Sequence, residues 1–190
     1  MRIIAGKFRG RKLHPAGALD LRPTSDRLRE TLFDVIAAAG SLEGTRWIDL
    51  YAGTGAVGIE ALSRGASYAC FVESARAPAV LIKRNLDSLE IAGRATVLPK
   101  PALKALDELD AKIKSGSEHA FDFCFLDPPY RMEAEYERVF VRLSKSSVLS
   151  TNALLVAEHS KHFDLAAAFG PWSRVRRLPQ GDAVLSFYRQ

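Results

Sequence analysis

The chain has 190 residues, 47% of them hydrophobic and 26% charged, which is the composition of an ordinary globular protein that can bury a substantial core. No apolar run approaches the roughly 18 residues of a membrane span. The start, "MRIIAGKFRGRK", is too basic for a secretory signal, so we expect a cytoplasmic protein. The net charge is +5, and the first 30 residues carry all of the excess, with eight Lys/Arg against three acids. A basic arm on a neutral body indicates a polyanionic partner.

The amino-terminal elements follow from turn and helix signals. The stretch "RIIAGKFRGRKL" predicts a hairpin around Gly6 and Gly10. Next, "RPTSDRLRETLFDVIAAAG" predicts a helix with a Thr/Ser cap and a stop at Gly40. Apolar residues recur on one face of this helix, namely Leu28, Leu32, Val35, Ile36 and Ala39. We expect residues 1–40 to form a small basic appendage and residues 41–190 to form the main domain.

From residue 46 onward, short apolar runs alternate with helical stretches. The predicted strands are 46–51, 68–73, 95–99, 121–127 and 152–158, and the predicted helices lie near 57–64, 75–89, 102–114 and 132–145. Continuous apolar strands separated by helices are typical of a parallel sheet covered on both faces. The end, "WSRVRRLPQGDAVLSFYR", predicts an antiparallel edge. The expected fold is therefore α/β, a Rossmann-like, doubly wound, mostly parallel sheet whose ligands bind beyond the carboxyl ends of the strands.

A glycine-rich turn follows the first of these strands. In "DLYAGTGAVGIEAL", Gly53, Gly55 and Gly58 match G-x-G-x-x-G, which taken alone is a weak signal. Asp49 precedes the first glycine by four residues, where a carboxylate suits an ammonium better than a diphosphate. Glu73 ends the next strand and could accept both hydroxyls of a ribose, which dinucleotides and S-adenosylmethionine share. The turn therefore indicates a nucleoside ligand.

The fourth predicted strand ends in "CFLDPPYRME". Two adjacent prolines fix φ twice and remove two donors, so Asp127-Pro128-Pro129-Tyr130 cannot continue a strand or a helix. In a doubly wound sheet this loop should face the glycine turn across one crevice. Asp127 and the Pro128 carbonyl could accept the N–H groups of a nucleobase amine, while Tyr130 stacks on the base.

These motifs together resemble S-adenosylmethionine-dependent amino-methyltransferases. The amino-terminal "RIIAGKFRGRKL" and "RPTSDRLRETLFDVI" narrow the resemblance to the bacterial 16S ribosomal RNA guanine-N2 methyltransferases of the guanine-966 type, and it extends to "GDAVLSFYR". The resemblance implies that Asp127, Pro128, Pro129 and Tyr130 form the catalytic loop around a flipped guanine. It implies transfer of a methyl group from S-adenosylmethionine to the exocyclic N2 of that guanine, in 16S ribosomal RNA or a small-subunit assembly particle.

The resemblance also assigns binding residues. It implies cofactor contacts at Asp49, Tyr51, Ala52, Gly53, Thr54, Gly55, Glu73, Ser74 and Ala102. It implies RNA contacts at Lys7, Arg9, Arg11, Arg22, Thr24 and Arg27. Members usually carry Gly-Asp after the third strand, whereas this chain has Lys100-Pro101, so we expect backbone groups near Ala102 to hold the adenine.

Other functions fit parts of the pattern. A DNA adenine-N6 or cytosine-N4 methyltransferase could use the same catalytic loop, although 190 residues leave little room for a target-recognition region. A nicotinamide dehydrogenase would have the same glycine turn. A non-catalytic ribosome-assembly factor would have the same basic amino-terminal segment. His159 and His162 are too few for a catalytic zinc site, so we expect no metal. The sequence predicts buried packing roles for Cys70 and Cys124 and gives no reason to expect more than a monomer.

Overall fold

A computed structural model describes residues 1–15 and 24–190 of the chain. Its contacts divide these residues into two compact units, Met1–Lys100 and Pro101–Gln190. Within residues 1–15 and 24–190, no helix is long and apolar enough to cross a membrane.

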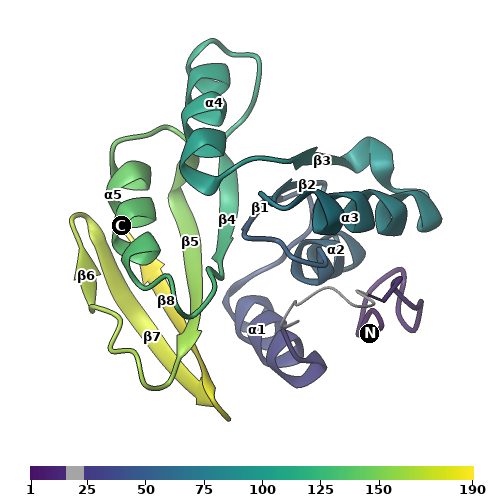
Figure 1. Ribbon diagram of the computed structural model, residues 1–190, viewed down its shortest axis with the longest axis horizontal. Coiled ribbons are helices and arrows are strands. Elements are labelled where there is room, and N and C mark those ends of the chain that lie inside the picture. The colour runs from purple at the N-terminus through teal and green to yellow at the C-terminus, as the bar shows by residue number, and fades with distance from the viewer. Residues whose placement is uncertain (16–23) are drawn as a thin grey trace. The chain divides into compact units, whose positions relative to one another are not determined.

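The first unit places helices against a short parallel sheet (Figure 1). Its elements are α1 (Asp26–Ala39), β1 (Arg46–Leu50), α2 (Ala56–Ser63), β2 (Tyr68–Val72), α3 (Arg76–Ser88), the 3-10 turn η1 (Ala92–Arg94) and β3 (Ala95–Leu98). The strands run in the order β3-β2-β1, with Ile48 opposite Cys70 and Phe71 opposite Val97. All three carboxyl ends consequently meet at one edge of the sheet, as a βαβ pattern requires. The predicted strands and helices of this unit are confirmed.

Helix α1 begins as its sequence predicts but buries a different face. The Ser25 hydroxyl accepts the Leu28 N–H at 3.1 Å, and the helix ends before Gly40. The predicted face is right at Leu28, Leu32 and Ile36, whereas Val35 is only half-buried and Ala39 is exposed. Phe33 and Arg29 are buried instead. Phe33 packs on the Trp47 ring with centroids 5.4 Å apart. The buried face of the helix is therefore centred on other residues than the predicted face.

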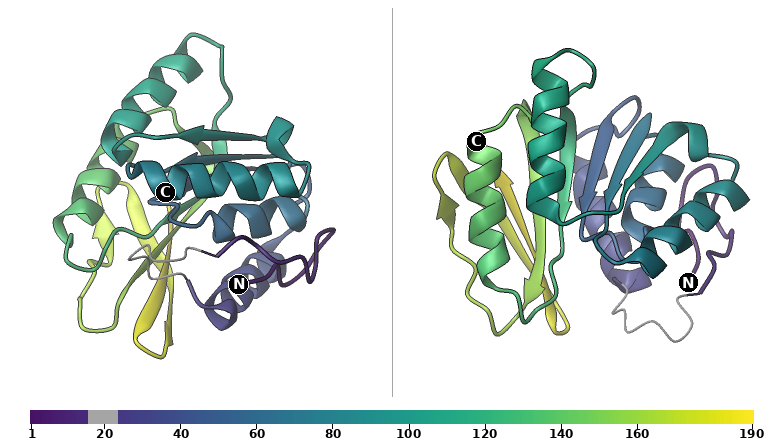
Figure 2. Two further views of the ribbon diagram at one scale, coloured as in Figure 1. Left: turned by 45° about the vertical axis from the view of Figure 1, so that its right-hand side comes forward. Right: turned by 45° about the horizontal axis from the view of Figure 1, so that its top comes forward.

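The amino-terminal segment folds back on itself without forming two full strands. Arg2 and Lys12 form an isolated antiparallel bridge, and the Ile3 N–H donates to the Arg11 carbonyl at 3.0 Å. The predicted hairpin is therefore present in a reduced form. The two views of Figure 2 show this segment beside α2 and α3, to which it is hydrogen-bonded.

The second unit joins a parallel strand pair to an antiparallel sheet. Its elements are α4 (Ala102–Lys114), β4 (Phe121–Leu126), α5 (Ala134–Ser144), β5 (Leu149–Ser160), β6 (Ala168–Phe169), β7 (Trp172–Gln180) and β8 (Ala183–Arg189). The order is β4-β5-β8-β7-β6, parallel between β4 and β5 and antiparallel from β5 onward. The predicted antiparallel edge is confirmed, and the short strand β6 adds to it.

Aromatic packing fixes α5 on this sheet. Phe140 stacks on Phe169 with ring centroids 4.2 Å apart and meets the Tyr188 ring edge-on at 4.8 Å. Cys70 in β2 and Cys124 in β4 are buried, as expected. With parallel strands joined by helices and an antiparallel carboxyl-terminal edge, the chain has the predicted mixed, Rossmann-like α/β fold.

Candidate functional site

The glycine turn between β1 and α2 has an unusual backbone. Tyr51, Gly53 and Gly55 adopt positive φ angles of 62°, 53° and 76°, and Gly55 caps the amino terminus of α2. A positive φ is uncommon at a non-glycine residue such as Tyr51 and marks backbone worth relating to function. The Ala52 N–H donates to the Val72 carbonyl at 2.9 Å, and the Gly55 N–H donates to the Ala52 carbonyl at 2.7 Å. The turn is therefore held in one conformation.

Each glycine of the motif is needed for its own reason. A Cβ at Gly58 would lie 2.4 Å from the Phe71 ring, so this glycine lets α2 pack closely on β2. A Cβ at Gly55 would meet the Ile82 side chain at 3.0 Å. A Cβ at Gly53 would have no neighbour within 4 Å, so only its φ favours glycine there and its outer side is open to a ligand.

Two carboxylates brace the turn. Asp49 is 2% exposed, and its Oδ2 accepts the Gly58 N–H at 3.0 Å, which satisfies a donor in the first turn of α2. Glu73 is half-buried, and its Oε2 and Oε1 accept the N–H groups of Gly53 at 2.9 Å and Ala75 at 2.8 Å. A carboxylate has about four acceptor positions, so Glu73 keeps capacity for ligand hydroxyls. Ser74 is exposed beside it.

The structure adds Asn85 to this turn. Asn85 is fully buried on α3, its Nδ2 donates to the Thr54 carbonyl at 3.3 Å, and its Oδ1 accepts the His14 N–H at 2.8 Å. Sequence reasoning did not identify it. The available signal was a polar residue between Ile82 and Leu86, on the buried side of an amphipathic helix.

Buried polar side chains on α2 anchor the basic arm, which we define as residues 1–15. Glu60 is 1% exposed and accepts the N–H groups of Ile4 at 2.8 Å and Ala5 at 2.9 Å. The Ser63 hydroxyl accepts the Phe8 N–H at 3.0 Å and donates to the Ala5 carbonyl at 2.6 Å. Because these bonds hold backbone groups, the cationic side chains of the arm are presented from a fixed support.

The predicted RNA-binding residues differ in their surroundings. Lys7, Arg9 and Arg11 are exposed, and the Arg11 guanidinium donates to the Ser88 carbonyl at 2.7 Å. Thr24 is half-buried and Arg27 is exposed at the start of α1. Arg22 lies outside the described residues.

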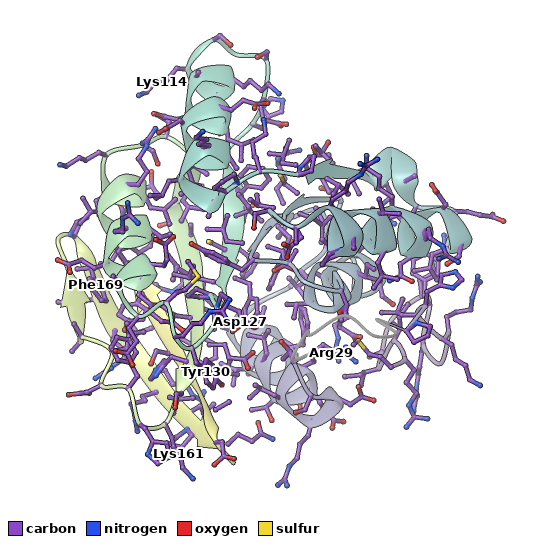
Figure 3. The ribbon with its side chains drawn as sticks, viewed as in Figure 1. Arg29, Lys114, Asp127, Tyr130, Lys161 and Phe169 are labelled. Carbon is purple, nitrogen blue, oxygen red and sulfur yellow. The ribbon has the colours of Figure 1, made fainter. Side chains whose placement is uncertain are left out.

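Arg29, next to this predicted set, is a buried anchor. It is a fully buried residue of α1 (Figure 3), and its guanidinium donates to the Arg2 carbonyl at 2.8 Å and to Asp26 at 2.9 Å. Burial lowers the pKa of Arg29, and the nearby carboxylates of Asp26 and Glu60 oppose that shift. Arg29 therefore fixes the arm to α1.

In the second unit, the Asp-Pro-Pro-Tyr loop leaves β4 as predicted. Residues 127–129 have no regular secondary structure, and the Met132 N–H donates to the Pro129 carbonyl at 2.7 Å before α5 begins. Pro128 is buried, Pro129 is exposed, and the Asp127 and Tyr130 side chains are half-buried. Figure 3 labels both of these side chains at the loop that follows β4. The two prolines between Asp127 and Tyr130 stiffen the backbone that carries the acid and the ring.

Tyr136, in the first turn of α5, is a buried residue that follows this loop. Its hydroxyl donates to the Glu158 carbonyl at 2.6 Å, and its ring stacks on Phe163 with centroids 5.5 Å apart. Burial raises the pKa of Tyr136 well above its usual value, and the Asp127 carboxylate and Tyr130 raise it further. The ionised form of Tyr136 is therefore disfavoured, and its hydroxyl keeps the proton that it donates to Glu158. The sequence offered no signal for the bond between Tyr136 and Glu158.

His159 has a packing role beside Tyr136. Its Nδ1 lies 2.9 Å from the Ser160 carbonyl, which can only accept, so Nδ1 donates and Nε2 accepts the Ser186 hydroxyl at 2.9 Å. Burial lowers the pKa of His159, which favours the neutral ring. His162 is exposed. In the part of the chain that the structure describes, no three His, Cys, Asp or Glu side chains are grouped to hold a metal ion.

Ala102, the predicted adenine contact, is the first residue of α4. It is 4% exposed and follows Pro101, which occupies the N-cap position without a side-chain cap. The first N–H groups of a helix have no partner within the helix, so a ligand acceptor could bind there.

Comparisons with known proteins cover the whole chain. The model of a family described as "Conserved hypothetical protein 95" matches residues 1–189. "Putative rRNA methyltransferase YlbH" of Bacillus subtilis is 33% identical over 190 residues, covering 100% of this chain and 99% of the relative. "Ribosomal RNA small subunit methyltransferase D" of Escherichia coli is 34% identical over 190 residues, covering 100% and 90%.

The fold is also similar to solved structures over the whole chain. "Putative methyltransferase yhhF from Escherichia coli" has a TM-score of 0.81 at 34% identity, covering 100% of this chain and 97% of that one. A Thermus thermophilus structure titled "hypothetical protein TTHA0928" has a TM-score of 0.81 at 31% identity, covering 100% and 99%. The similarity therefore extends over both compact units, the arm and the carboxyl-terminal strands.

Proposed function

Because the chain belongs to the family described as "Conserved hypothetical protein 95", alongside proteins named ribosomal RNA small subunit methyltransferase D, we propose that it methylates a guanine of 16S ribosomal RNA at the exocyclic N2. The observation that carries the choice of an amino group is the Asp127-Pro128-Pro129-Tyr130 loop, which ends a buried strand with fixed hydrogen-bond acceptors and an aromatic ring. Domain boundaries at residue 40, a cytoplasmic location and a monomer remain our predictions.

The glycine turn and Glu73 fit a nucleoside cofactor with a charged amino-acid part. Gly53 has an open side, and Glu73 is held in place by two N–H groups while keeping free acceptor capacity. We assign the methionine part to the turn, residues 49–55, the ribose to Glu73 and Ser74, and the adenine to backbone groups at Ala102. When bound, S-adenosylmethionine supplies a methyl group already activated by its positive sulfur.

The catalytic loop orients the acceptor nitrogen. The Asp127 carboxylate and the Pro128 carbonyl would accept the two N–H groups of the guanine amine, which draws the nitrogen lone pair out of conjugation with the ring and aims it at the methyl carbon. Tyr130 would stack on the base, and Pro129 keeps the acceptors from reorganising. Asp127 acts as an orienting acceptor and not as a strong base, because the amine acidifies once it is methylated. The buried thiols of Cys70 and Cys124 take no part.

The basic arm would bind the RNA backbone. Its exposed Lys and Arg side chains are displayed from a segment whose own backbone is fixed on α2. Phosphate contacts of this kind supply affinity and orientation without reading sequence. The exposed Arg27 on α1 and the predicted contact Thr24 would extend the same surface.

Methyl transfer to defined nucleic acids tests this function. The protein would be incubated with methyl-tritiated S-adenosylmethionine and with protein-loaded small subunits, naked 16S RNA or plasmid DNA, all from a strain deleted for the homologous gene. We expect label in ribosomal RNA, and mass spectrometry should locate it as N2-methylguanine. Label in plasmid adenine or cytosine would instead support a DNA methyltransferase. A chain that binds the particle but never the cofactor would be an assembly factor.

The Asp127→Ala variant tests the catalytic loop. We expect turnover to fall at least roughly 100-fold, while the affinity for S-adenosylhomocysteine changes less than about twofold, because Asp127 orients the base and not the cofactor. Asp164→Ala, at an exposed aspartate of the same unit, is the matched control. Near-normal turnover by the Asp127 variant would refute the role.

A further inference from the structure

Asn85 uses both ends of its buried amide to hold two separate backbone segments. It is 0% exposed between Ile82 and Leu86, where an unsatisfied amide would be costly. Its Oδ1 accepts the His14 N–H at 2.8 Å and its Nδ2 donates to the Thr54 carbonyl at 3.3 Å. A backbone N–H can only donate and a carbonyl can only accept, so one orientation of the amide satisfies both contacts.

The contact with Thr54 fixes a peptide group within the glycine turn. The Thr54 carbonyl and the Gly55 N–H belong to the same planar peptide. Asn85 holds the carbonyl, and the Ala52 carbonyl holds the N–H at 2.7 Å. Rotation of this peptide would break both bonds, so Asn85 helps to set the conformation of the backbone assigned to the cofactor.

The contact with His14 fixes the carboxyl-terminal end of the arm. Further anchors of the arm are Glu60 and Ser63 on α2 and Arg29 on α1. Helix α2 itself begins at the glycine turn, with Gly55 as its N-cap. The arm is therefore tied to the helix that follows the turn and, through Asn85, to the turn directly.

We propose that Asn85 is a positioning residue that couples the arm to the glycine turn, so that RNA bound on the arm raises the affinity of the turn for the cofactor. The coupling rests on the proposed function, because it takes the arm as the RNA-binding segment and the turn as the cofactor site. If the arm is displaced, the Asn85 Oδ1 loses the His14 N–H. The Asn85 side chain can then rotate and give up its bond to the Thr54 carbonyl. Linkage requires the converse as well, so the cofactor raises the affinity for RNA by the same factor.

Binding of S-adenosylhomocysteine, with and without RNA, measures the coupling. Calorimetry would be run at fixed salt with the full chain, alone and saturated with 16S RNA. For the wild-type chain we expect RNA to tighten binding at least about fivefold, the lower end of typical coupling between sites. Asn85→Asp keeps an oxygen for the His14 N–H but replaces the donor to Thr54 with a second acceptor. We expect the RNA effect in this variant to fall below about twofold.

Two further variants separate coupling from loss of structure. Asn152→Asp makes the same chemical change at an exposed asparagine and should keep the wild-type RNA effect. His14→Pro removes the arm's N–H donor without altering Asn85. It should also abolish the RNA effect, and it serves in place of Asn85→Asp if thermal melting shows that the latter is unfolded.

The outcomes distinguish the coupling from the proposed function. A wild-type chain that binds the cofactor product and RNA with no mutual effect would overturn the coupling alone. The coupling would also be overturned if the RNA effect survived in both Asn85→Asp and His14→Pro. It would be overturned as well if the control Asn152→Asp abolished the RNA effect as fully as Asn85→Asp does. A wild-type chain that fails to bind either ligand by itself would overturn the proposed function.

Discussion

The Glu73 carboxylate accepts the Gly53 N–H at 2.9 Å, so the acid that directly follows β2 braces the turn that follows β1. This pairing arises because parallel neighbours bring their carboxyl ends to the same edge of a sheet. The second oxygen accepts the Ala75 N–H at 2.8 Å, which fixes the direction of the carboxylate. An acid with a predicted ligand role is thereby preorganised by the backbone it supports.

Replacing Glu73 with glutamine should weaken cofactor binding. One oxygen would become an NH₂ group facing a backbone N–H, so either Gly53 or Ala75 would lose its acceptor. We expect the affinity for S-adenosylhomocysteine, measured by calorimetry, to fall at least about tenfold, which corresponds to the roughly 1.5–3 kcal/mol of a charged hydrogen bond. The control Glu137→Gln, at an exposed position of α5, should leave the affinity for S-adenosylhomocysteine unchanged. Unchanged affinity in the Glu73 variant would contradict its assignment.

Gly58→Ala should destabilise the first unit. The new Cβ would lie 2.4 Å from the Phe71 ring, and neither α2 nor β2 can give way without disturbing the core. We expect the free energy of unfolding, from urea denaturation, to fall by about 1–3 kcal/mol. Gly93→Ala is the control, because a Cβ there meets nothing within 4 Å. Adding Phe71→Leu to Gly58→Ala should restore part of the lost free energy of unfolding. A loss well below about 1 kcal/mol in the single variant Gly58→Ala would argue against the close packing of α2 on β2.

Much of this fold could be predicted from periodic patterns. Continuous apolar runs located β1 to β5, and the Ser25 cap located the start of α1. The glycine spacing located the turn because positive φ and close helix packing leave few other residues possible there. Such signals are local, so one sequence is enough to detect them.

The anchors of the arm could not be predicted in this way. Glu60 and Asn85 are buried polar residues whose partners lie 56 and 71 residues away, and helix periodicity contains no information about a partner so distant. Arginine is rarely buried, so helix periodicity does not predict that Arg29 lies in the core, where its guanidinium donates to the Arg2 carbonyl and to Asp26. Strand β6, with two residues, is too short to show alternation.

Asp110 should make the stability of the second unit depend on pH. The Ser147 N–H, at 2.8 Å, lowers the pKa of Asp110 from 3.8 to about 2, burial opposes the shift, and Lys114 and Arg142 add to it. A folded pKa below the unfolded one gives stability that is present above about pH 4 and is lost as the pH falls toward 2.

The Asp110→Asn variant measures this contribution. We expect urea denaturation at pH 6 to show a loss of about 1–2 kcal/mol, because a backbone donor and two cations lose their charged partner. The difference from wild type should narrow below pH 4. Asp107→Asn removes a carboxylate that is 66% exposed and should cost less than about 1 kcal/mol. A difference that does not vary between pH 6 and pH 3 would show that the charge of Asp110 is not responsible.

The arm should confer a measurable salt dependence on RNA binding. Lys7 and Arg9 are exposed cations on the arm, so replacing both with glutamine should remove two phosphate contacts while leaving the backbone anchors in place. Each contact contributes roughly 0.7 to 0.9 to the slope of log affinity against log salt, so the slope should become shallower by roughly 1.4 to 1.8. Filter binding of 16S RNA over a salt series gives this slope. The control is Arg176→Gln with Arg177→Gln, which removes two exposed cations from β7. An equal change of slope in the control would show that general cationic charge, and not the arm, attracts the RNA.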